Sequence, residues 1–173
     1  GLQGEFGIGL LSFWTVGEEL SLTSSGADGK TYQMQMRKGA PGYSVRQTGK
    51  LFAERGTELR IVPLLPGIRQ FSGEKIQWYL ASELRDRIRK SGVQIRIVDH
   101  TARAELQVEP RQFTGRLLHQ LPRPAAAQGE VYVELYLSEP SPTNQVGVYR
   151  AGTRVLERIT DLDAFVRPPW NSG

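Results

Sequence analysis

Apolar and polar residues alternate along much of the first third of the chain. Four runs show this period of two and predict strands: 19–24, 31–37, 43–47 and 58–63. The turn-forming cluster Ser25-Gly26-Ala27-Asp28-Gly29 separates the first two runs. We therefore expect a meander of strands in which the first two form a hairpin.

A helical period replaces this alternation in the middle of the chain. The apolar positions fall on one helical face: Ile76, Leu80, Leu84 and Ile88. Ser72 is a suitable N-cap, and Gly92 follows the last turn. The pattern predicts one continuous helix over 74–91, joined directly to a strand over 93–98.

Proline and alanine interrupt the pattern after residue 99, most densely over 110–129. We therefore expect a first domain over 1–99, a linker or long loop over 100–129, and an incomplete second domain over 130–173. Four apolar residues, at 131, 133, 135 and 137, alternate with polar and aromatic ones and predict a strand with one buried face. Ala151-Gly152 lies between two further strand patterns, 146–150 and 153–159, and predicts a hairpin turn.

Composition places the chain among globular proteins. It has 173 residues, of which 39% are hydrophobic and 23% charged. No apolar run approaches the ~20 residues of a membrane helix, so no membrane partner is expected. The chain has no cysteine, which excludes disulfides and zinc–thiolate sites and agrees with a cytoplasmic location.

The segment Gly4-Glu5-Phe6-Gly7-Ile8-Gly9-Leu10 carries three glycines and leads into a predicted helix over 9–16, which Gly17 ends. Glycine permits positive φ and close approach of a ligand to the backbone. A helix that begins there presents unpaired N–H groups, which suit a phosphate chain. No strand precedes the glycines and no Gly-Lys-Ser/Thr follows, so neither the Rossmann nor the Walker motif applies.

This segment resembles the ATP lid of the GHKL ATPases, the superfamily of DNA gyrase B, the ninety-kilodalton heat-shock chaperones, histidine kinases and MutL. The residues that match its G-x-F-G-x-G-x-x-S pattern are Gly4, Phe6, Gly7, Gly9 and Ser12. The resemblance implies that the backbone amides from Phe6 to Leu10, with those of Ile8 and Gly9 among them, cap the β- and γ-phosphates of ATP. It also implies that Gly56-Thr57 opens the strand beneath the adenine and that the threonine helps to bind this base through water.

The resemblance implies an α+β fold: the C-terminal half of a Bergerat-type sandwich, followed by the start of a ribosomal-S5-like domain. The family's catalytic glutamate, its magnesium-binding asparagine and its adenine-binding Asp-x-Gly-x-Gly element cannot be placed in this sequence. We therefore expect a fragment of a parent that uses ATP and magnesium. The fragment itself is expected to be inactive and to hold no cofactor, and we assign it no catalytic or metal-binding residue.

Two other classes of function remain open. The first is an interaction or scaffold module that does not bind nucleotide. The second is a nucleic-acid binder, because the net charge is +4 and arginines gather around Arg85, Arg89 and Arg96. A solvated helix face explains the same arginines. The oligomeric state, a homodimer included, is not determined by the sequence.

The other polar candidates give weaker signals. His100 and His119 lie too far apart in the sequence to indicate a metal site, and we expect both to face solvent. Asp161 and Asp163 suit a turn or a helix cap better than a cation site. The indole rings at positions 14 and 78 are expected in a core or an interface.

Overall fold

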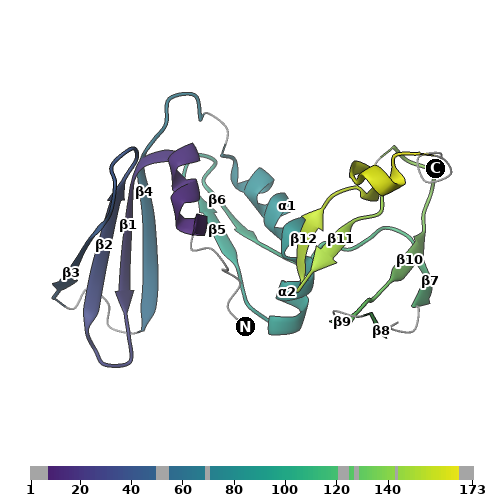
Figure 1. The fold of residues 1–173 in the computed structure, drawn as a ribbon, viewed down its shortest axis with the longest axis horizontal. Helices are drawn as coiled ribbons and strands as arrows, with labels where there is room; N and C mark the ends of the chain where they lie inside the picture. The colour runs from purple at the N-terminus through teal and green to yellow at the C-terminus, as the bar shows by residue number, and fades with distance from the viewer. Residues whose placement is uncertain are drawn as a thin grey trace. The chain divides into compact units, whose positions relative to one another are not determined.

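The computed structural model describes residues 8–49, 55–68, 71–120, 125–126, 129–142 and 144–167. The chain forms two compact units, Gly1–Gln70 and Phe71–Gly173. Both contain antiparallel strands and helical segments, so the predicted α+β class is confirmed (Figure 1). The proposed boundaries near residues 99 and 129 stay predictions, because compact units and functional domains need not coincide.

The first unit contains a four-stranded sheet with the order β3-β2-β1-β4, in which every neighbouring pair is antiparallel. Its strands are β1 (Gly17–Ser25), β2 (Thr31–Arg37), β3 (Ser44–Thr48) and β4 (Gly56–Leu64). Each begins and ends within two residues of its predicted bounds. The four predicted strands are thus confirmed.

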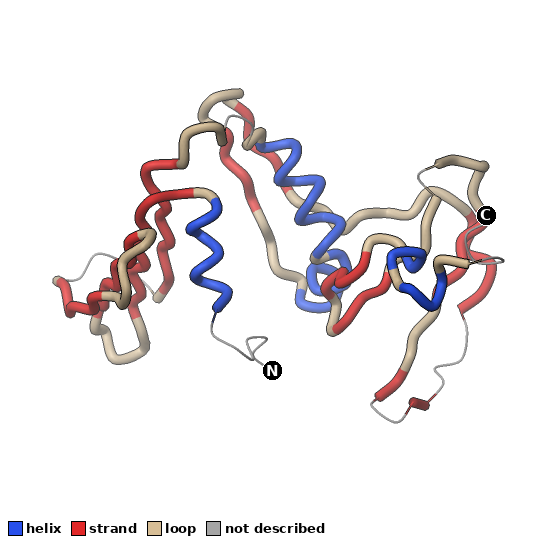
Figure 2. The backbone as a smooth tube through the Cα atoms, turned by 45° about the horizontal axis from the view of Figure 1, so that its top comes forward, coloured by secondary structure: helices blue, strands red, loops and turns tan. Residues whose placement is uncertain are grey.

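One face of this sheet is apolar. Leu20 lies opposite Met36 on β2 and Ile61 on β4. The 3-10 helix η1 (Ile8–Thr15) packs against β1 (Figure 2). Phe13 of η1 and Leu20 of β1 are 2% and 1% exposed, and they are the buried apolar residues among those described in this unit. The core of the first unit is therefore small.

Gly17 has a different role from the one predicted. The helix does end before Gly17, but this residue begins β1 and does not take the left-handed conformation of a C-terminal glycine. A Cβ atom at Gly17 would collide with the side chain of Ile61 on β4. Close approach of two strands, and not helix capping, therefore requires glycine here.

In its described residues the second unit has two helices, four small antiparallel strand pairs and two short 3-10 helices. Its helices are α1 (Gly73–Glu83) and α2 (Arg85–Ser91), with η2 (Ile159–Asp161) and η3 (Asp163–Phe165) near its end. The strand pairs are β5 (Arg96–Asp99) with β6 (Ala104–Gln107), β7 (Arg116–Gln120) with β10 (Glu134–Leu137), β8 (Ala125–Ala126) with β9 (Gly129–Glu130), and β11 (Val148–Arg150) with β12 (Thr153–Leu156). No helix among the described residues is long and apolar enough to span a bilayer.

The predicted single helix over 74–91 is wrong at its centre. Leu84, with φ −105° and ψ 13°, separates α1 from α2. Both predicted ends are confirmed: the Ser72 side chain accepts a hydrogen bond from the N–H of Lys75, and Gly92 is left-handed with φ 65°. Local capping signals were therefore reliable, whereas the break was not signalled by the apolar period.

Of three other predictions in the second unit, two change and one is confirmed. The strand predicted over 93–98 begins only at Arg96. The stretch 100–129, predicted as a linker or long loop, contains strands β6, β7 and β8 and is therefore not a continuous loop, whereas its role as a linker between domains stays a prediction. The hairpin turn at Ala151-Gly152 is confirmed, and both residues have positive φ, 50° and 82°.

Helix α1 is held against the β5–β6 pair by backbone and side-chain hydrogen bonds. The N–H of Gly73 donates to Oδ2 of Asp99 at 2.7 Å, and Nε2 of Gln77 donates to the carbonyl oxygen of Gln107 at 2.6 Å. The carboxylate of Asp99 also accepts hydrogen bonds from the N–H groups of Thr101 and Ala102. Asp99 thus fixes both the first turn of α1 and the β5–β6 turn.

Candidate functional site

The residues expected to bind nucleotide are partly described by the structure. Gly4, Phe6 and Gly7 lie outside the described residues. The remaining residues of the glycine segment, Ile8, Gly9 and Leu10, form the first turn of η1. The predicted helix after the glycines is therefore present, and it is a 3-10 helix.

The direction of η1 relates the glycine segment to Gly56-Thr57. A tight turn at Val16, whose N–H donates to the carbonyl oxygen of Phe13, reverses the chain between η1 and β1. Strand β4 is antiparallel to β1. Helix η1 and strand β4 therefore both begin toward the carboxyl end of β1 (Figure 1). The two segments that resemble the nucleotide-binding motifs are thus directed to the same end of the first unit.

Thr57 lies at that end, in register with Ser24 of β1. Their hydroxyl oxygens are 2.9 Å apart, and either one can be the donor. Gly56 and Thr57 are both exposed. Because a hydroxyl donates one hydrogen bond and accepts two, the Thr57 hydroxyl keeps hydrogen-bonding capacity for a ligand or a water molecule.

The arginines considered for nucleic acid do not form a free basic surface. Arg85 is 7% exposed, and its guanidinium is buried among protein groups. Arg89 lies 3.5 Å from Asp86 on its own helix. Arg96 pairs with Glu105 at 3.2 Å on the neighbouring strand. A surface that contains Arg85 would need this residue to leave its buried partners, which disfavours the nucleic-acid interpretation.

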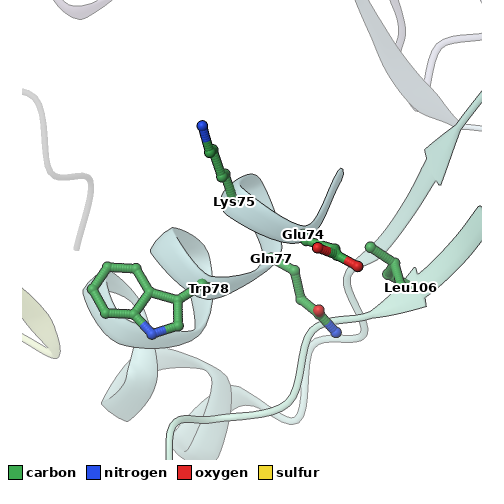
Figure 3. A pocket seen from close by; sticks show the side chains of 5 residues that line it. All are labelled: Glu74, Lys75, Gln77, Trp78 and Leu106. Carbon is green, nitrogen blue, oxygen red and sulfur yellow. The ribbon is translucent and has the colours of Figure 1, made fainter. Parts of the chain in front are cut away.

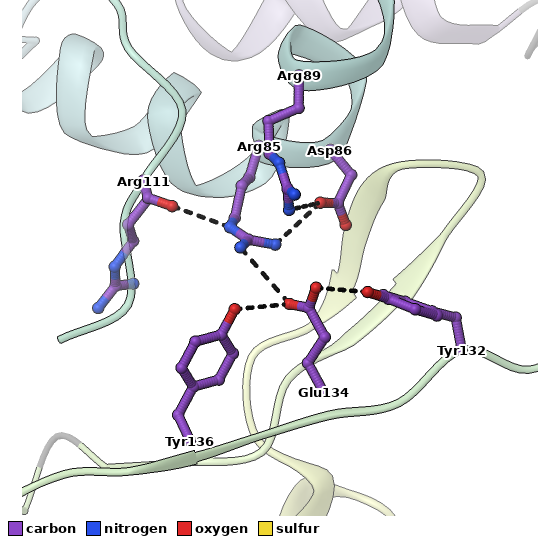
Figure 4. Close-up of polar contacts among 7 residues, drawn as sticks. All are labelled: Arg85, Asp86, Arg89, Arg111, Tyr132, Glu134 and Tyr136. Atoms are coloured by element: carbon purple, nitrogen blue, oxygen red, sulfur yellow. Dashed lines mark hydrogen bonds and ion pairs between the residues drawn. The ribbon is translucent and has the colours of Figure 1, made fainter. Parts of the chain in front are cut away.

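Arg85 is the centre of a charge cluster that joins α2 to β10 (Figure 4). Its Nε donates to the carbonyl oxygen of Arg111 at 2.9 Å, and its Nη1 donates to Oδ1 of Asp86 at 2.9 Å. Its Nη2 lies 3.6 Å from Oε2 of Glu134. The guanidinium also stacks 4.4 Å above the ring of Phe113. Arg85 therefore satisfies most of its donors inside the unit.

Glu134 receives hydrogen bonds from two phenols of its own strand region. The hydroxyl of Tyr132 donates to Oε1 at 2.7 Å, and that of Tyr136 donates to Oε2 at 2.9 Å. Burial raises the pKa of the Glu134 carboxyl, but these two hydrogen bonds and the positive charge of Arg85 outweigh burial and lower the pKa below its ordinary value. Glu134 is thus a stably ionised carboxylate, which is unsuited to act as a proton donor near neutral pH.

The two tyrosines are equally unsuited to proton transfer near neutral pH. The hydrogen bond to Glu134 raises the pKa of Tyr132, and burial together with the same carboxylate raises the pKa of Tyr136. Both phenols therefore stay protonated and act as donors. The cluster therefore keeps an ionised carboxylate, that of Glu134, beside the guanidinium of Arg85.

A shallow depression lies beside the first turns of α1 (Figure 3). Its lining residues are Glu74, Lys75, Gln77, Trp78 and Leu106. Trp78 is 54% exposed, so a core position for this residue is wrong. The guanidinium of Arg111 lies 5.3 Å from the Trp78 ring centre, which places a cation over part of this exposed indole.

Strand β10 reverses the burial expected from its pattern. Leu135 and Leu137 are exposed, whereas Glu134 and Tyr136 are half-buried. The sequence did contain a signal, because Tyr132, which precedes β10, alternates with Glu134 and Tyr136 of the strand. The burial of Glu134 depends on its ion pair with Arg85, which is distant in the sequence, so this cluster was not identified from the sequence.

No group of three or more histidine, aspartate and glutamate side chains suited to a metal ion occurs in the described parts of the chain. Asp161 is the last residue of η2 and lies 3.3 Å from Arg158. Asp163 begins η3, at a position typical of a helix start.

No protein-family model matches the sequence. No curated protein matches it either.

Proposed function

We propose that the chain is part of a GHKL-type ATP-binding protein and contributes to its nucleotide site. The observation that carries the proposal is the pairing of β1 with β4. The strand that follows the glycine segment and η1 lies directly beside the strand that Gly56-Thr57 begins. Two motifs matched separately in the sequence therefore flank one pair of strands and are directed to one end of it.

In this proposal the main-chain N–H groups from Phe6 to Leu10 bind the β- and γ-phosphates of ATP. The Thr57 hydroxyl, supported by Ser24 at 2.9 Å, assists adenine binding through water. Magnesium would enter with ATP. Hydrolysis would need a glutamate that we assign to the parent protein and not to this chain, so the chain alone is expected to be inactive.

The second edge of β4 also supports the proposal. Among the described residues β4 pairs only with β1, so its second edge has no neighbouring strand there. The resemblance implies that the strand opened by Gly56-Thr57 is central in its sheet. The proposal therefore assigns the strand that pairs with the second edge of β4 to another part of the parent protein. We expect this parent to be cytoplasmic.

The test is ATP binding by the intact protein to which this chain belongs, measured by isothermal titration calorimetry with Mg·ATP and with adenosine. Replacement of Thr57 by valine should weaken both ligands by about tenfold, because one polar contact to the adenine is lost. Replacement of Gly9 by valine should weaken ATP but leave adenosine almost unchanged, because the lid contacts only phosphates.

The matched control is Thr48→Val. Thr48 is the last residue of β3, on the opposite edge of the same sheet, and its hydroxyl donates to the carbonyl oxygen of Gly49. This variant should bind both ligands normally. Absence of saturable Mg·ATP binding to the intact protein, or equal affinity of wild type and Thr57→Val, would contradict the proposal and favour a scaffold module.

A further inference from the structure

Two buried ion pairs flank the break between α1 and α2. Glu83, the last residue of α1, accepts a hydrogen bond at 2.9 Å from Nε of Arg154 on β12. Arg85, the first residue of α2, pairs with Glu134 on β10. These four side chains are between 8% and 16% exposed. A single residue, Leu84, thus separates two opposite charges that are paired with two different strand pairs, β11–β12 and β7–β10.

Leu84 interrupts the helix but keeps its own two helical hydrogen bonds, while the carbonyl oxygen of Ala81 accepts from the N–H of Arg111. The N–H of Leu84 donates to the carbonyl oxygen of Leu80 at 2.9 Å, and its own carbonyl oxygen accepts from the N–H of Ile88 at 2.9 Å. Its φ and ψ nevertheless depart from helical values. Residues at the ends of elements that absorb such changes act as hinges in many proteins.

We propose that Leu84 is a hinge and that Glu83 and Arg85 transmit its bending to the strand pairs β11–β12 and β7–β10. The physical reason is the cost of an unpaired buried charge, which obliges each strand pair to follow its partner residue. Each arginine also has a second carboxylate close by: Asp86 at 2.9 Å from Arg85, and Glu157 at 3.8 Å from Arg154. The proposal concerns the second unit alone and does not require nucleotide binding.

The test is amide hydrogen exchange of the full chain, resolved to individual strands. Glu83→Gln should speed exchange in β12, where Arg154 loses its charged partner. If bending passes through Leu84, the same variant should also speed exchange in β10, by on the order of tenfold. Glu134→Gln should have the reciprocal effect on β12.

Ile88→Val is the matched control, because it removes one buried methyl group from α2 and leaves both ion pairs in place. It should speed hydrogen exchange in β10 and β12 only in proportion to its global loss of stability. The double exchange Glu83→Arg with Arg154→Glu restores an ion pair and should return β10 to the wild-type rate. If Glu83→Gln fails to fold, this double variant still tests the proposal through the exchange rate of β10.

Unchanged exchange in β10 when Glu83 is replaced would overturn the proposal, because the Glu83–Arg154 pair would then act only on its own hairpin. Additive effects of Glu83→Gln and Glu134→Gln on both strands would overturn it as well. Non-additive effects on both strands are the result that supports a hinge.

Discussion

Arg85 of α2 and Glu134 of β10 lie 3.6 Å apart between Nη2 and Oε2, and the two phenols of Tyr132 and Tyr136 complete the surroundings of this carboxylate (Figure 4). The pair joins a helix to a strand that lies far along the chain. Because both side chains are largely buried, the interaction is poorly screened by solvent. The second unit should therefore depend strongly on the charge state of Glu134.

Acid should destabilise the second unit through Glu134. Its pKa is lowered in the folded state, so its contribution to the free energy of unfolding is complete above the ordinary glutamate pKa of about 4.3 and is lost as the pH falls through the lowered folded value. Asp99, whose pKa is lowered first by the N–H of Ala102 and then by that of Gly73, acts in the same direction. Urea unfolding at a series of pH values measures this slope. The Glu134→Gln variant should flatten it, and an unchanged slope in that variant would contradict the assignment.

Glu134→Gln should lower the free energy of unfolding of the second unit by about 2 kcal/mol, because it removes one of the two carboxylates beside the buried Arg85 and leaves Asp86 in place. Glu105→Gln is the control, since its ion pair with Arg96 is more than half exposed on both sides. That variant should cost under about 1 kcal/mol. Equal losses of unfolding free energy for the two variants in urea titrations would contradict the prediction that the buried ion pair contributes more than the exposed one.

Gly152→Ala should destabilise the β11–β12 hairpin. Gly152 has φ 82°, and an added Cβ would lie 3.1 Å from the backbone nitrogen of Arg87 on α2. The left-handed conformation alone costs about 1–2 kcal/mol with a Cβ, and the contact with α2 adds to it. Gly92→Ala, also left-handed but in open space, should show only the conformational cost. Thermal unfolding of both variants separates the two contributions, and Gly152→Ala should have the lower midpoint.

Leu20→Ala tests the small core of the first unit. Leu20 is 1% exposed at the centre of β1, and its truncation should cost about 2–5 kcal/mol. Leu59 on β4 is 48% exposed, so Leu59→Ala should cost clearly less. Chemical denaturation is followed by fluorescence in a Trp78→Phe, Trp170→Phe background, in which Trp14 of η1 is the remaining tryptophan and reports on this unit. Similar losses for the two leucines would argue against the packing of η1 on β1.

The strands of the first unit and the caps of α1–α2 were predictable because their signals are local. Alternation over 31–37 requires only that successive side chains point to opposite faces of a strand. Ser72 and Gly92 act on the backbone of neighbouring residues, so their roles follow from their positions next to a helical pattern. The nucleotide site, by contrast, stays a prediction from resemblance, supported by the register of β1 and β4.

The sequence alone determined where most strands and helix ends lie, because backbone preference and side-chain period act over a few residues. Only the tertiary structure decided which polar groups are buried. Arg85 is typical of an exposed helix face until Glu134 and the carbonyl of Arg111 lie beside it. The break at Leu84 was missed for a similar reason, because the two charges beside it pair with Arg154 on β12 and Glu134 on β10, which lie far along the chain. Burial of a charge depends on partners that the local pattern does not contain.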